Sequence, residues 1–377
     1  MATAPQTARK TAPASSRIFR YLLANAEPRT KQEIATDLGL SLPTVYQGLD
    51  ALEERQLVRP AESRSSTGGR RATPYTVNDQ GPLATGISLT GTSVRIVIIN
   101  LAGRWVVAED YPLDATKPDQ LGAAARARLE ELLEREGLDA RPLAGACIAL
   151  PAIIDPASTG PISAPSMGCD HLDPALLTDG YPCPVSLAND ASCGGYAECF
   201  GAQSPSSLAY LSLERGVGGA VIVNGTPHEG ANGRAGEFGH MTVEPGGKLC
   251  HCGDRGHLEA YCSMAALSDE LGITIDEFFS RLPHCPDDPV VAPAWESFLS
   301  HLAQGIAIIR MANDVDVVIG GLLASPLLPY LDEIRERVAE YDPFTTDAKY
   351  VRIARHPFHG VPLGAARKAL AAYIQRV

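Results

Sequence analysis

The chain has 377 residues, of which 45% are hydrophobic and 20% charged, with 35 Gly, 29 Pro and nine Cys. This composition excludes disordered and collagen-like chains, and at ~100–200 residues per domain the length predicts two or three domains. No run of ~18 apolar residues is present, so no membrane helix is predicted. Residues 1–15 lack the apolar stretch of ~7 residues that a secretory signal needs. We therefore expect a cytoplasmic protein whose cysteines stay reduced.

The formal net charge of −12 is unevenly distributed. Residues 1–78 contain 11 Lys and Arg against 7 Asp and Glu, whereas the remainder contains 21 against 37. A basic segment before an acidic body is typical of a DNA-binding head on an effector domain, although uneven surface charge alone has the same appearance. We therefore divide the chain into a disordered arm at 1–15, a DNA-binding domain at 16–79 and a larger domain at 80–377.

Three short helices are predicted at the start of the DNA-binding domain. Apolar residues at 18, 19, 22 and 23 share one face of the first helix. Thr30 and Glu33 form a capping box that begins the second helix, which Gly39 ends. Ser41 caps the third helix. This spacing predicts a helix-turn-helix.

The third helix is the predicted recognition helix. Val45, Leu49 and Leu52 form its buried face, so its N-terminal end points outward. A glutamine there can bond two edge atoms of adenine, and a threonine can contact a thymine methyl group or a phosphate. The side chains that this end offers to the major groove are Leu42, Pro43, Thr44, Tyr46 and Gln47.

A hairpin is predicted after Leu57-Val58, where two β-prone runs flank the segment SSTGGRR. At its cationic tip, Arg70 and Arg71 would neutralise phosphates along the backbone or the minor groove. Helix spacing, charge and hairpin together predict a winged helix-turn-helix that binds a double-stranded DNA operator. The alternative is a three-helix module that serves only for contact between subunits.

From residue 84 onward, strands and helices alternate. Three strands joined by Gly turns are predicted at 84–113, a helix at 121–136 and a buried strand at 144–150. A second series of strands and helices is predicted between 185 and 319. Two such units predict an α/β body of two lobes with a ligand cleft between them.

Four segments of the body resemble the ROK family of repressors, open reading frames and sugar kinases. They are LANDA (187–191), GVGGAVIVNG (216–225), GRAGEFGH (233–240) and CHCGDRGHLE (250–259). The resemblance runs from about Ser16 to the last helix and includes the GGRR wing. It implies an actin-like, sugar-kinase-type body of two lobes that assembles as a homodimer or homotetramer.

A metal cluster is predicted within eighteen residues of the body. The predicted zinc ligands are His240, Cys250, Cys252 and His257. Four nitrogen and sulfur ligands suit one tetrahedral structural Zn²⁺ and leave no position for a catalytic water. Relatives with this element have a cysteine as the last ligand, so the fourth position is open, and His251 or Cys262 are alternatives. Reduced surface thiols without metal are the other interpretation.

The resemblance also implies a sugar site. The residues that match it are Asn189, Asp190, Glu237, His240 and Glu259. A carboxylate accepts hydrogen bonds from two sugar hydroxyls, and an Asn both donates and accepts. His240 could bind the metal through one ring nitrogen and the sugar through the other. Ala152, Ser166 and Cys169 depart from the family pattern near this site, so the identity of the sugar is open.

Two turns of the body indicate whether it phosphorylates a sugar or only senses one. By resemblance, a ROK kinase uses the Asp of Asn-Asp as general base and holds ATP·Mg²⁺ with Asp-x-Gly-Gly-Thr and Gly-Thr-Gly turns. Here Ser88 replaces the acidic residue and Thr90 a glycine, while Glu214-Arg215 replaces Gly-Thr. A phosphate cradle needs bare backbone N–H groups, so the sequence predicts that ATP no longer binds and that the chain is not an enzyme.

The favoured interpretation is a sugar-responsive transcription factor, predicted to be a repressor, whose lobes change angle when ligand binds. One alternative is an active ROK sugar kinase with a DNA-binding head. Another is a body that docks a protein instead of a sugar. The operator sequence, the effector sugar and its phosphorylation state are open at this stage.

Overall fold

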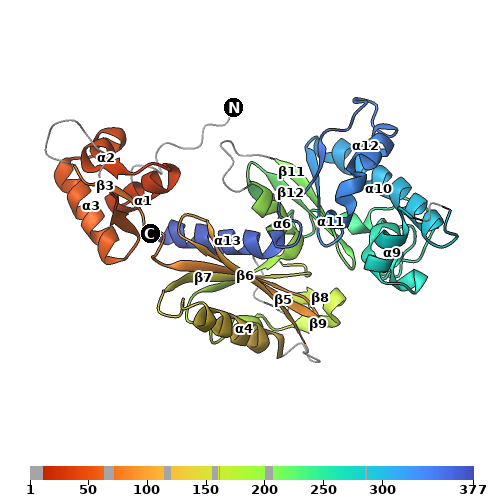
Figure 1. Cartoon of the computed structure of the whole chain (residues 1–377), viewed down its shortest axis with the longest axis horizontal. Helices are drawn as coiled ribbons and strands as arrows, with labels where there is room; N and C mark the ends of the chain where they lie inside the picture. Colours follow the sequence, from red (N-terminus) through yellow and green to blue (C-terminus); the bar gives the residue numbers. More distant parts are fainter. Residues whose placement is uncertain are drawn as a thin grey trace.

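The chain folds into an N-terminal winged helix followed by two α/β lobes (Figure 1). The computed structural model describes residues 12–62, 72–113, 120–154, 160, 162–199, 207–284 and 287–377. Among the helices in these ranges, none combines the length and apolar character that crossing a membrane requires. The predicted arm and wing tip fall largely outside the described residues.

The winged helix combines three helices with a small antiparallel sheet of strand order β1-β3-β2. Its elements are α1 (Ala14–Ala24), β1 (Arg29–Thr30), α2 (Lys31–Leu38), α3 (Leu42–Glu54), β2 (Val58–Pro60) and β3 (Pro74–Val77). The predicted capping box of Thr30 and Glu33 is present, and Gly39 ends α2 with a φ of 61°. Ser41 caps α3 by accepting from the backbone N–H of Thr44. The helix-turn-helix prediction is confirmed.

The first lobe is built on a five-stranded sheet of order β10-β7-β4-β5-β6. Its strands are β4 (Leu83–Leu89), β5 (Ser93–Asn100), β6 (Trp105–Pro112), β7 (Leu143–Leu150) and β10 (Val185–Asn189). The first three form the predicted antiparallel meander, and the last two pair in parallel. Helix α4 (Leu121–Arg135) packs on one face of the sheet, and α13 (Gly360–Arg376) packs on the other (Figure 1).

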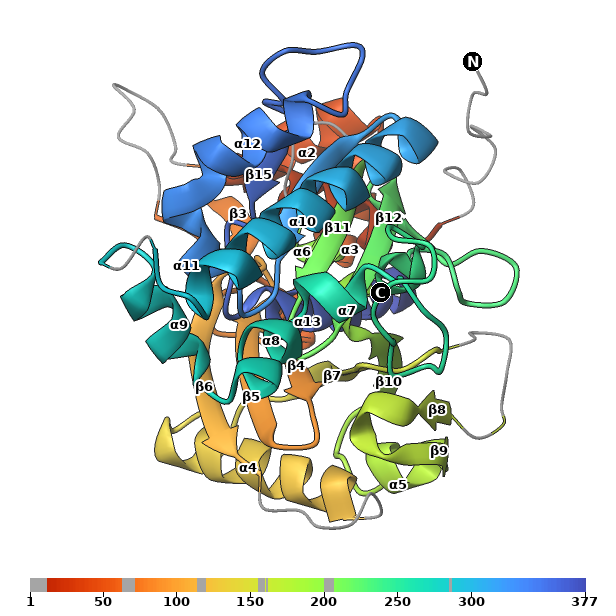
Figure 2. The same ribbon diagram turned by 90° about the vertical axis from the view of Figure 1, so that its right-hand side faces the viewer.

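The second lobe repeats this topology with the order β13-β12-β11-β14-β15. Its strands are β11 (Leu208–Leu213), β12 (Val217–Val223), β13 (Thr226–His228), β14 (Asp316–Gly320) and β15 (Val351–Ile353). Helices α10 (Val291–Asn313) and α12 (Leu331–Ala339) cover one face of this sheet, and α6 (Asp190–Cys199) covers the other (Figure 2). The repeat gives an α/β body of two similar lobes.

Helices α6 and α13 pack against each other between the two sheets (Figure 1). Glycines make this close packing possible. A Cβ on Gly364 of α13 would lie 1.8 Å from the carbonyl oxygen of Cys193, and one on Gly86 of β4 would lie 1.9 Å from that of Pro362. Any side chain at these two positions would force the layers apart.

Short elements complete the body. They are β8 (Ile162–Ala164), β9 (Cys169–Leu172), α5 (Pro174–Thr178), α7 (Glu259–Cys262), α8 (Met264–Leu267), α9 (Ile275–Arg281), α11 (Ala324–Leu327) and the 3₁₀ turns η2 (Pro165–Met167), η3 (Phe238–His240), η4 (Asp269–Leu271) and η5 (Leu328–Tyr330). The long loop between η3 and α7 contains the predicted metal ligands.

Arg141 anchors the connection between the winged helix and the first lobe. Its guanidinium donates to the carbonyl oxygens of Asp79 and Gly81, each at 2.7 Å. The apolar cores of the winged helix and of the α13 face of the first lobe form one continuous cluster of buried side chains. A change in the first lobe can therefore reach the DNA-binding domain through packed contacts.

Candidate functional site

The four predicted metal ligands lie together in the loop between η3 and α7. One ligand atom from each of them lies within 4.8 Å of the others. Sγ of Cys250 lies 3.9 Å from Nδ1 of His240, and Sγ of Cys252 lies 3.3 Å from Nδ1 of His257. Two imidazole nitrogens and two thiol sulfurs at this spacing could hold a metal ion, and they match the ligands that Zn²⁺ prefers.

Glycines shape this metal loop. Gly253 and Gly256 have φ values of 97° and 80°, which side chains rarely allow. A Cβ on Gly256 would also lie 1.7 Å from the carbonyl oxygen of Glu244. The loop therefore turns back on itself and brings His257 to the two cysteines.

The two alternative metal ligands, Cys262 and His251, lie in different places relative to the cluster. Cys262 is buried, and its thiol donates to the carbonyl oxygen of Phe298 at 3.7 Å, outside the cluster. His251 lies at the edge of the cluster, with Nδ1 3.7 Å from Sγ of Cys250, and it pairs with Glu259. Cys250, His251 and Glu259 thus form a second possible ligand group that shares one cysteine with the first.

Glu237, His240 and Glu259 form one part of the predicted sugar site. Glu237 immediately precedes η3, and His240 is its last residue. Burial raises the pKa of Glu237, and the charge of Glu259 acts in the same direction. Because Nδ1 of His240 faces Cys250, its other ring nitrogen points away from Cys250. This geometry allows one imidazole to contact both a metal and a sugar.

Glycines also let the segment before η3 lie directly on strand β12. A Cβ on Gly219 would lie 2.6 Å from the carbonyl oxygen of Gly236, and one on Gly239 would lie 2.1 Å from that of Val217. The backbone beside Glu237 and His240 is therefore held against the second lobe.

Asn189 and Asp190 form the other part of the predicted sugar site, where β10 meets α6. The side chain of Asn189 donates to the carbonyl oxygen of Ala152 at 3.2 Å and accepts from the backbone N–H of Ser192 at 2.9 Å. Oδ1 of Asp190 accepts from the N–H of Ala191 at 2.8 Å. Burial raises the pKa of Asp190 to about 7, and the charge of Glu214 contributes to the rise.

The turn between β11 and β12 connects the two parts. The backbone N–H of Val217 donates to Oε2 of Glu259 at 2.9 Å. On the other side, Glu214 lies 3.4 Å from Arg95 of β5 and acts electrostatically on Asp190. One carboxylate therefore lies on each side of the turn that matches the family's second phosphate turn.

Arg95 is a functional candidate that the sequence analysis did not include. Its side chain is 6% exposed, and it donates to the carbonyl oxygen of Phe358 at 2.9 Å and to Glu214. The signal for it is a single arginine within the apolar strand SVRIVIIN, opposite Ser88 in the sheet. A charge buried in a strand requires a partner, and here the partner comes from the other lobe.

The first predicted phosphate turn, between β4 and β5, is closed by its own side chain. Oγ1 of Thr90 accepts from the backbone N–H groups of Thr92 and Ser93, at 3.3 and 3.1 Å. The N–H of Thr90 itself donates to the carbonyl oxygen of Ser93 at 3.0 Å. Three N–H groups of this turn are thus already bonded.

The N-terminal end of α3 presents its predicted DNA-contacting residues to solvent. Leu42, Pro43, Tyr46 and Gln47 are exposed, while the half-buried Thr44 shares a hydrogen bond of 2.7 Å with Ser41. Arg70 and Arg71 lie outside the described residues.

Lys31 is a further residue of this surface that the sequence analysis did not include. Its Nζ lies 3.8 Å from the centre of the Tyr46 ring and 5.2 Å from that of Tyr75. Its position as the first residue of α2, directly after the Thr30 cap, was the available signal. This contact holds a positive charge beside the exposed end of α3.

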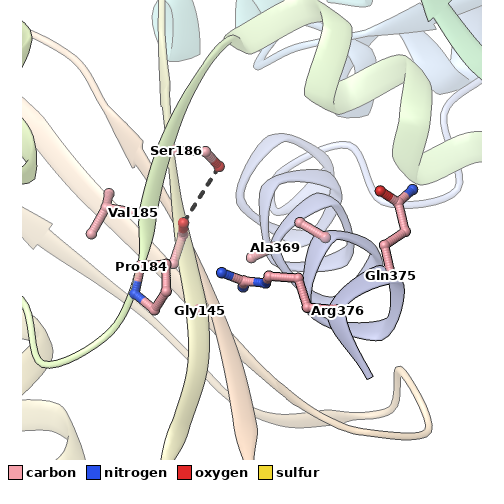
Figure 3. A pocket seen from close by; sticks show the side chains of 9 residues that line it. Gly145, Pro184, Val185, Ser186, Ala369, Gln375 and Arg376 are labelled. Carbon is pink, nitrogen blue, oxygen red and sulfur yellow. Dashed lines mark hydrogen bonds between the residues drawn. The ribbon is translucent and has the colours of Figure 1, made fainter. Parts of the chain in front are cut away.

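A separate hollow of about 340 Å³ lies between the strands β7 and β10 and the end of α13 (Figure 3). Arg376 extends over it, and Gly145 and Pro184 line its opposite wall (Figure 3). The candidate sugar residues do not line it. It is therefore distinct from the predicted sugar site.

Comparison with known proteins identifies the family. Residues 84–369 match the model of the ROK family, and residues 15–62 match the IclR helix-turn-helix domain. The chain belongs to the ROK family. Its body therefore has the ROK actin-like, sugar-kinase fold, and the resemblance inferred from sequence is confirmed.

Two similar relatives of this ROK protein are named as transcription factors. It is 27% identical to the DNA-binding transcriptional dual regulator NagC of Escherichia coli over 338 residues. This alignment covers 84% of this chain and 83% of NagC. It is 26% identical to the xylose repressor of Bacillus spizizenii over 257 residues. This alignment covers 67% of this chain and 66% of the repressor.

Solved structures of both regulators and kinases share the ROK fold. A ROK family transcriptional regulator that is a homologue of the E. coli MLC protein matches with a TM-score of 0.73 and 19% identity over 96% of this chain and 97% of its own. The ROK hexokinase of Thermus thermophilus matches with a TM-score of 0.63 and 25% identity over 78% of this chain and 100% of its own. The regulator match also includes the winged helix.

Proposed function

We propose that this chain is a sugar-responsive, DNA-binding transcription regulator that acts as a repressor. One observation carries the proposal: the residues that match the family's sugar site are present, while N–H groups of the two turns that match its phosphate turns are bonded to the chain's own side chains. The relatives NagC and the xylose repressor support the same function. In this proposal the sugar is held by Asn189, Asp190, Glu237, His240 and Glu259.

The closed turns support loss of ATP binding. Phosphate oxygens are bound by free backbone N–H groups, and those of Thr92 and Ser93 are taken by Thr90. The N–H of Val217 is taken by Glu259. A nucleotide would have to break these hydrogen bonds and would then face the charge of Glu214. We infer that the body senses sugar without phosphorylating it.

An active sugar kinase is the second candidate, because Asp190 retains the position of a general base. Its raised pKa of about 7 suits proton transfer near neutral pH. The fold shared with the Thermus hexokinase is consistent with this candidate. ADP release in the presence of a hexose and ATP·Mg²⁺ would support it and would contradict the sensor.

The winged helix is proposed to bind its operator through two surfaces. The exposed end of α3 enters the major groove, where Gln47 and Thr44 contact bases or phosphates. Arg70 and Arg71 of the wing then neutralise backbone phosphates. Two copies would read two half-sites, so we propose a homodimer or homotetramer that acts in the cytoplasm.

We propose Zn²⁺ as the ion of the metal loop, one per chain and structural. His240, Cys250, Cys252 and His257 offer a complete tetrahedral set, as a structural zinc site requires. Glu259 begins α7 two residues after His257. The ion would therefore fix the position of a carboxylate of the sugar site.

DNA selection followed by a sugar panel tests this function. The full-length protein is used to select binding fragments from random DNA, and the affinity for the selected site is measured by fluorescence anisotropy with and without each sugar. A repressor of this kind should bind a defined site and lose affinity with one class of sugar. Sequence-independent binding that no sugar changes would contradict the proposal.

A further inference from the structure

The turn between β11 and β12 carries one negative and one positive side chain, and they point in opposite directions. Glu214 lies 3.4 Å from Arg95 of the first lobe, and 20% of its side chain is exposed. Arg215 instead pairs with Asp269 at 2.6 Å, and 82% of its side chain is exposed. The turn therefore presents its carboxylate to the first lobe and its guanidinium to solvent.

The guanidinium of Arg95 already has a partner at each of its two ends. One end of its guanidinium donates to the carbonyl oxygen of Phe358 at 2.9 Å, and the other faces Glu214. Cζ of Arg95 also lies 5.7 Å from the centre of the Phe358 ring. The backbone of Glu214 is held in place, because its N–H donates to Gly216 and its carbonyl oxygen accepts from Met264. The ion pair is thus built into the junction of the lobes.

Asp190 lies within the field of this ion pair. Burial raises its pKa most, the negative charge of Glu214 raises it further, and Arg95 opposes the rise by a smaller amount. The turn that carries Glu214 also lies close to Asp190 in the fold, because a Cβ on Gly218, at the start of β12, would lie 3.6 Å from Cβ of Ala191. A group bound to Asp190 therefore lies beside its carboxylate and near the turn that carries the carboxylate of Glu214.

We infer that the sugar site accepts an unphosphorylated sugar and rejects a sugar that carries phosphate on the hydroxyl beside Asp190. The inference rests on the proposed sugar site. A neutral hydroxyl can donate a hydrogen bond to Asp190. A phosphate dianion there would meet the carboxylates of Asp190 and Glu214. Arg95 is paired with Glu214, and the N–H groups of Thr92 and Val217 are already bonded.

Calorimetric titration of the zinc-loaded, full-length protein tests this inference without ATP. The probes are glucose, N-acetylglucosamine and glucosamine, each paired with its 6-phosphate. We expect at least one free sugar to bind, and its 6-phosphate to bind at least ~10-fold more weakly, which corresponds to ~1.4 kcal/mol. The variant Glu214→Gln should reduce the ratio of the two dissociation constants, 6-phosphate over free sugar, several-fold. The glutamine keeps an oxygen for Arg95 but removes the negative charge. The control Arg215→Gln should leave the ratio unchanged.

The outcomes separate this inference from the proposed function. A 6-phosphate that binds as tightly as its free sugar would overturn the inference and leave the sensor intact. If the variant Arg95→Gln then no longer binds the 6-phosphate, Arg95 must leave Glu214 and bind the phosphate group in the wild-type protein. If no sugar binds in either form, the sugar site itself is wrong and the inference fails with it. An unchanged ratio in Glu214→Gln would also contradict it.

Discussion

Oε2 of Glu259 accepts a hydrogen bond from the backbone N–H of Val217 at 2.9 Å, which joins the metal loop to the turn between β11 and β12. A Cβ on the neighbouring Gly216 would lie only 2.7 Å from the same oxygen, so the contact depends on a residue without a side chain. Since Glu259 begins α7 directly after the metal loop, an ion in that loop would control both the sugar site and the turn.

Removal of the metal should therefore weaken sugar binding as well as stability. We expect about one zinc per chain by elemental analysis, and close to none in the variant Cys252→Ser. Cys252 is exposed, so its replacement disturbs little packing. The variant should unfold at a temperature several degrees lower and bind sugar more weakly, because Glu259 is no longer held in position.

The matched control is Cys183→Ser, which changes a half-buried cysteine far along the chain from the metal loop. It should keep its zinc and its sugar affinity. A wild-type protein that contains no zinc and is fully stable after chelation would overturn the metal assignment.

Glu237→Gln should separate DNA binding from the response to sugar. The substitution removes a negative charge that accepts hydrogen bonds from sugar hydroxyls, and a charged acceptor forms stronger bonds than a neutral one. The segment around Glu237 packs on strand β12 of the second lobe, whereas the winged helix packs on the first lobe. Operator affinity should thus stay within about two-fold of wild type, a difference under ~0.5 kcal/mol, while the sugar no longer changes it. A normal sugar response in anisotropy titrations would remove Glu237 from the site.

The winged helix shows how far local signals can predict structure. The capping box at Thr30, the left-handed Gly39 and the Ser41 cap all depend on groups within a few residues, and all are present as predicted. The buried strand predicted at 144–150 is observed as Leu143–Leu150 for a similar reason, since continuous apolar sequence predicts a covered strand.

Contacts between distant segments could not be predicted in the same way. Arg95 and Glu214 are separated by 119 positions, and only the packing of the two lobes brings them together. Strand β15 has three residues and pairs with β14, so it has no periodicity to detect. The hydrogen bonds of Thr90 were equally hidden, because the sequence shows that a glycine is absent but not that a threonine hydroxyl closes the turn.

The wing should contribute to DNA affinity through phosphate contacts. We expect Arg70→Ala combined with Arg71→Ala to weaken binding and to flatten the plot of log K against log salt by roughly one unit per lost contact. The control pair is Arg128→Ala with Arg135→Ala on α4, on the far side of the first lobe from the winged helix (Figure 1). Anisotropy titrations over a range of salt concentrations measure both slopes, and a slope equal to that of wild type would exclude the wing from the interface.

Asp190 should make the protein less stable as the pH rises. Burial raises its pKa to about 7 in the folded chain, whereas the ordinary value is 3.8. Below pH 4 the carboxyl is protonated in both states and has no effect. Between pH 4 and 7 the folded state retains a proton that the unfolded state loses, so ionisation progressively favours unfolding, and above pH 7 the full cost is present.

The variant Asp190→Asn removes this cost and should be more stable than wild type at pH 8, by an amount on the order of a few kcal/mol at most. The two proteins should converge at low pH, because a protonated carboxyl and an amide are similar in size and charge. Urea unfolding at pH 5 and pH 8 measures the difference, with the exposed Asp179→Asn as control. An Asp190→Asn protein that is less stable than wild type at pH 8 would mean that the ionised carboxylate is held by partners that stabilise the fold. Asp190 would then be a structural residue rather than one kept for binding at the expense of stability.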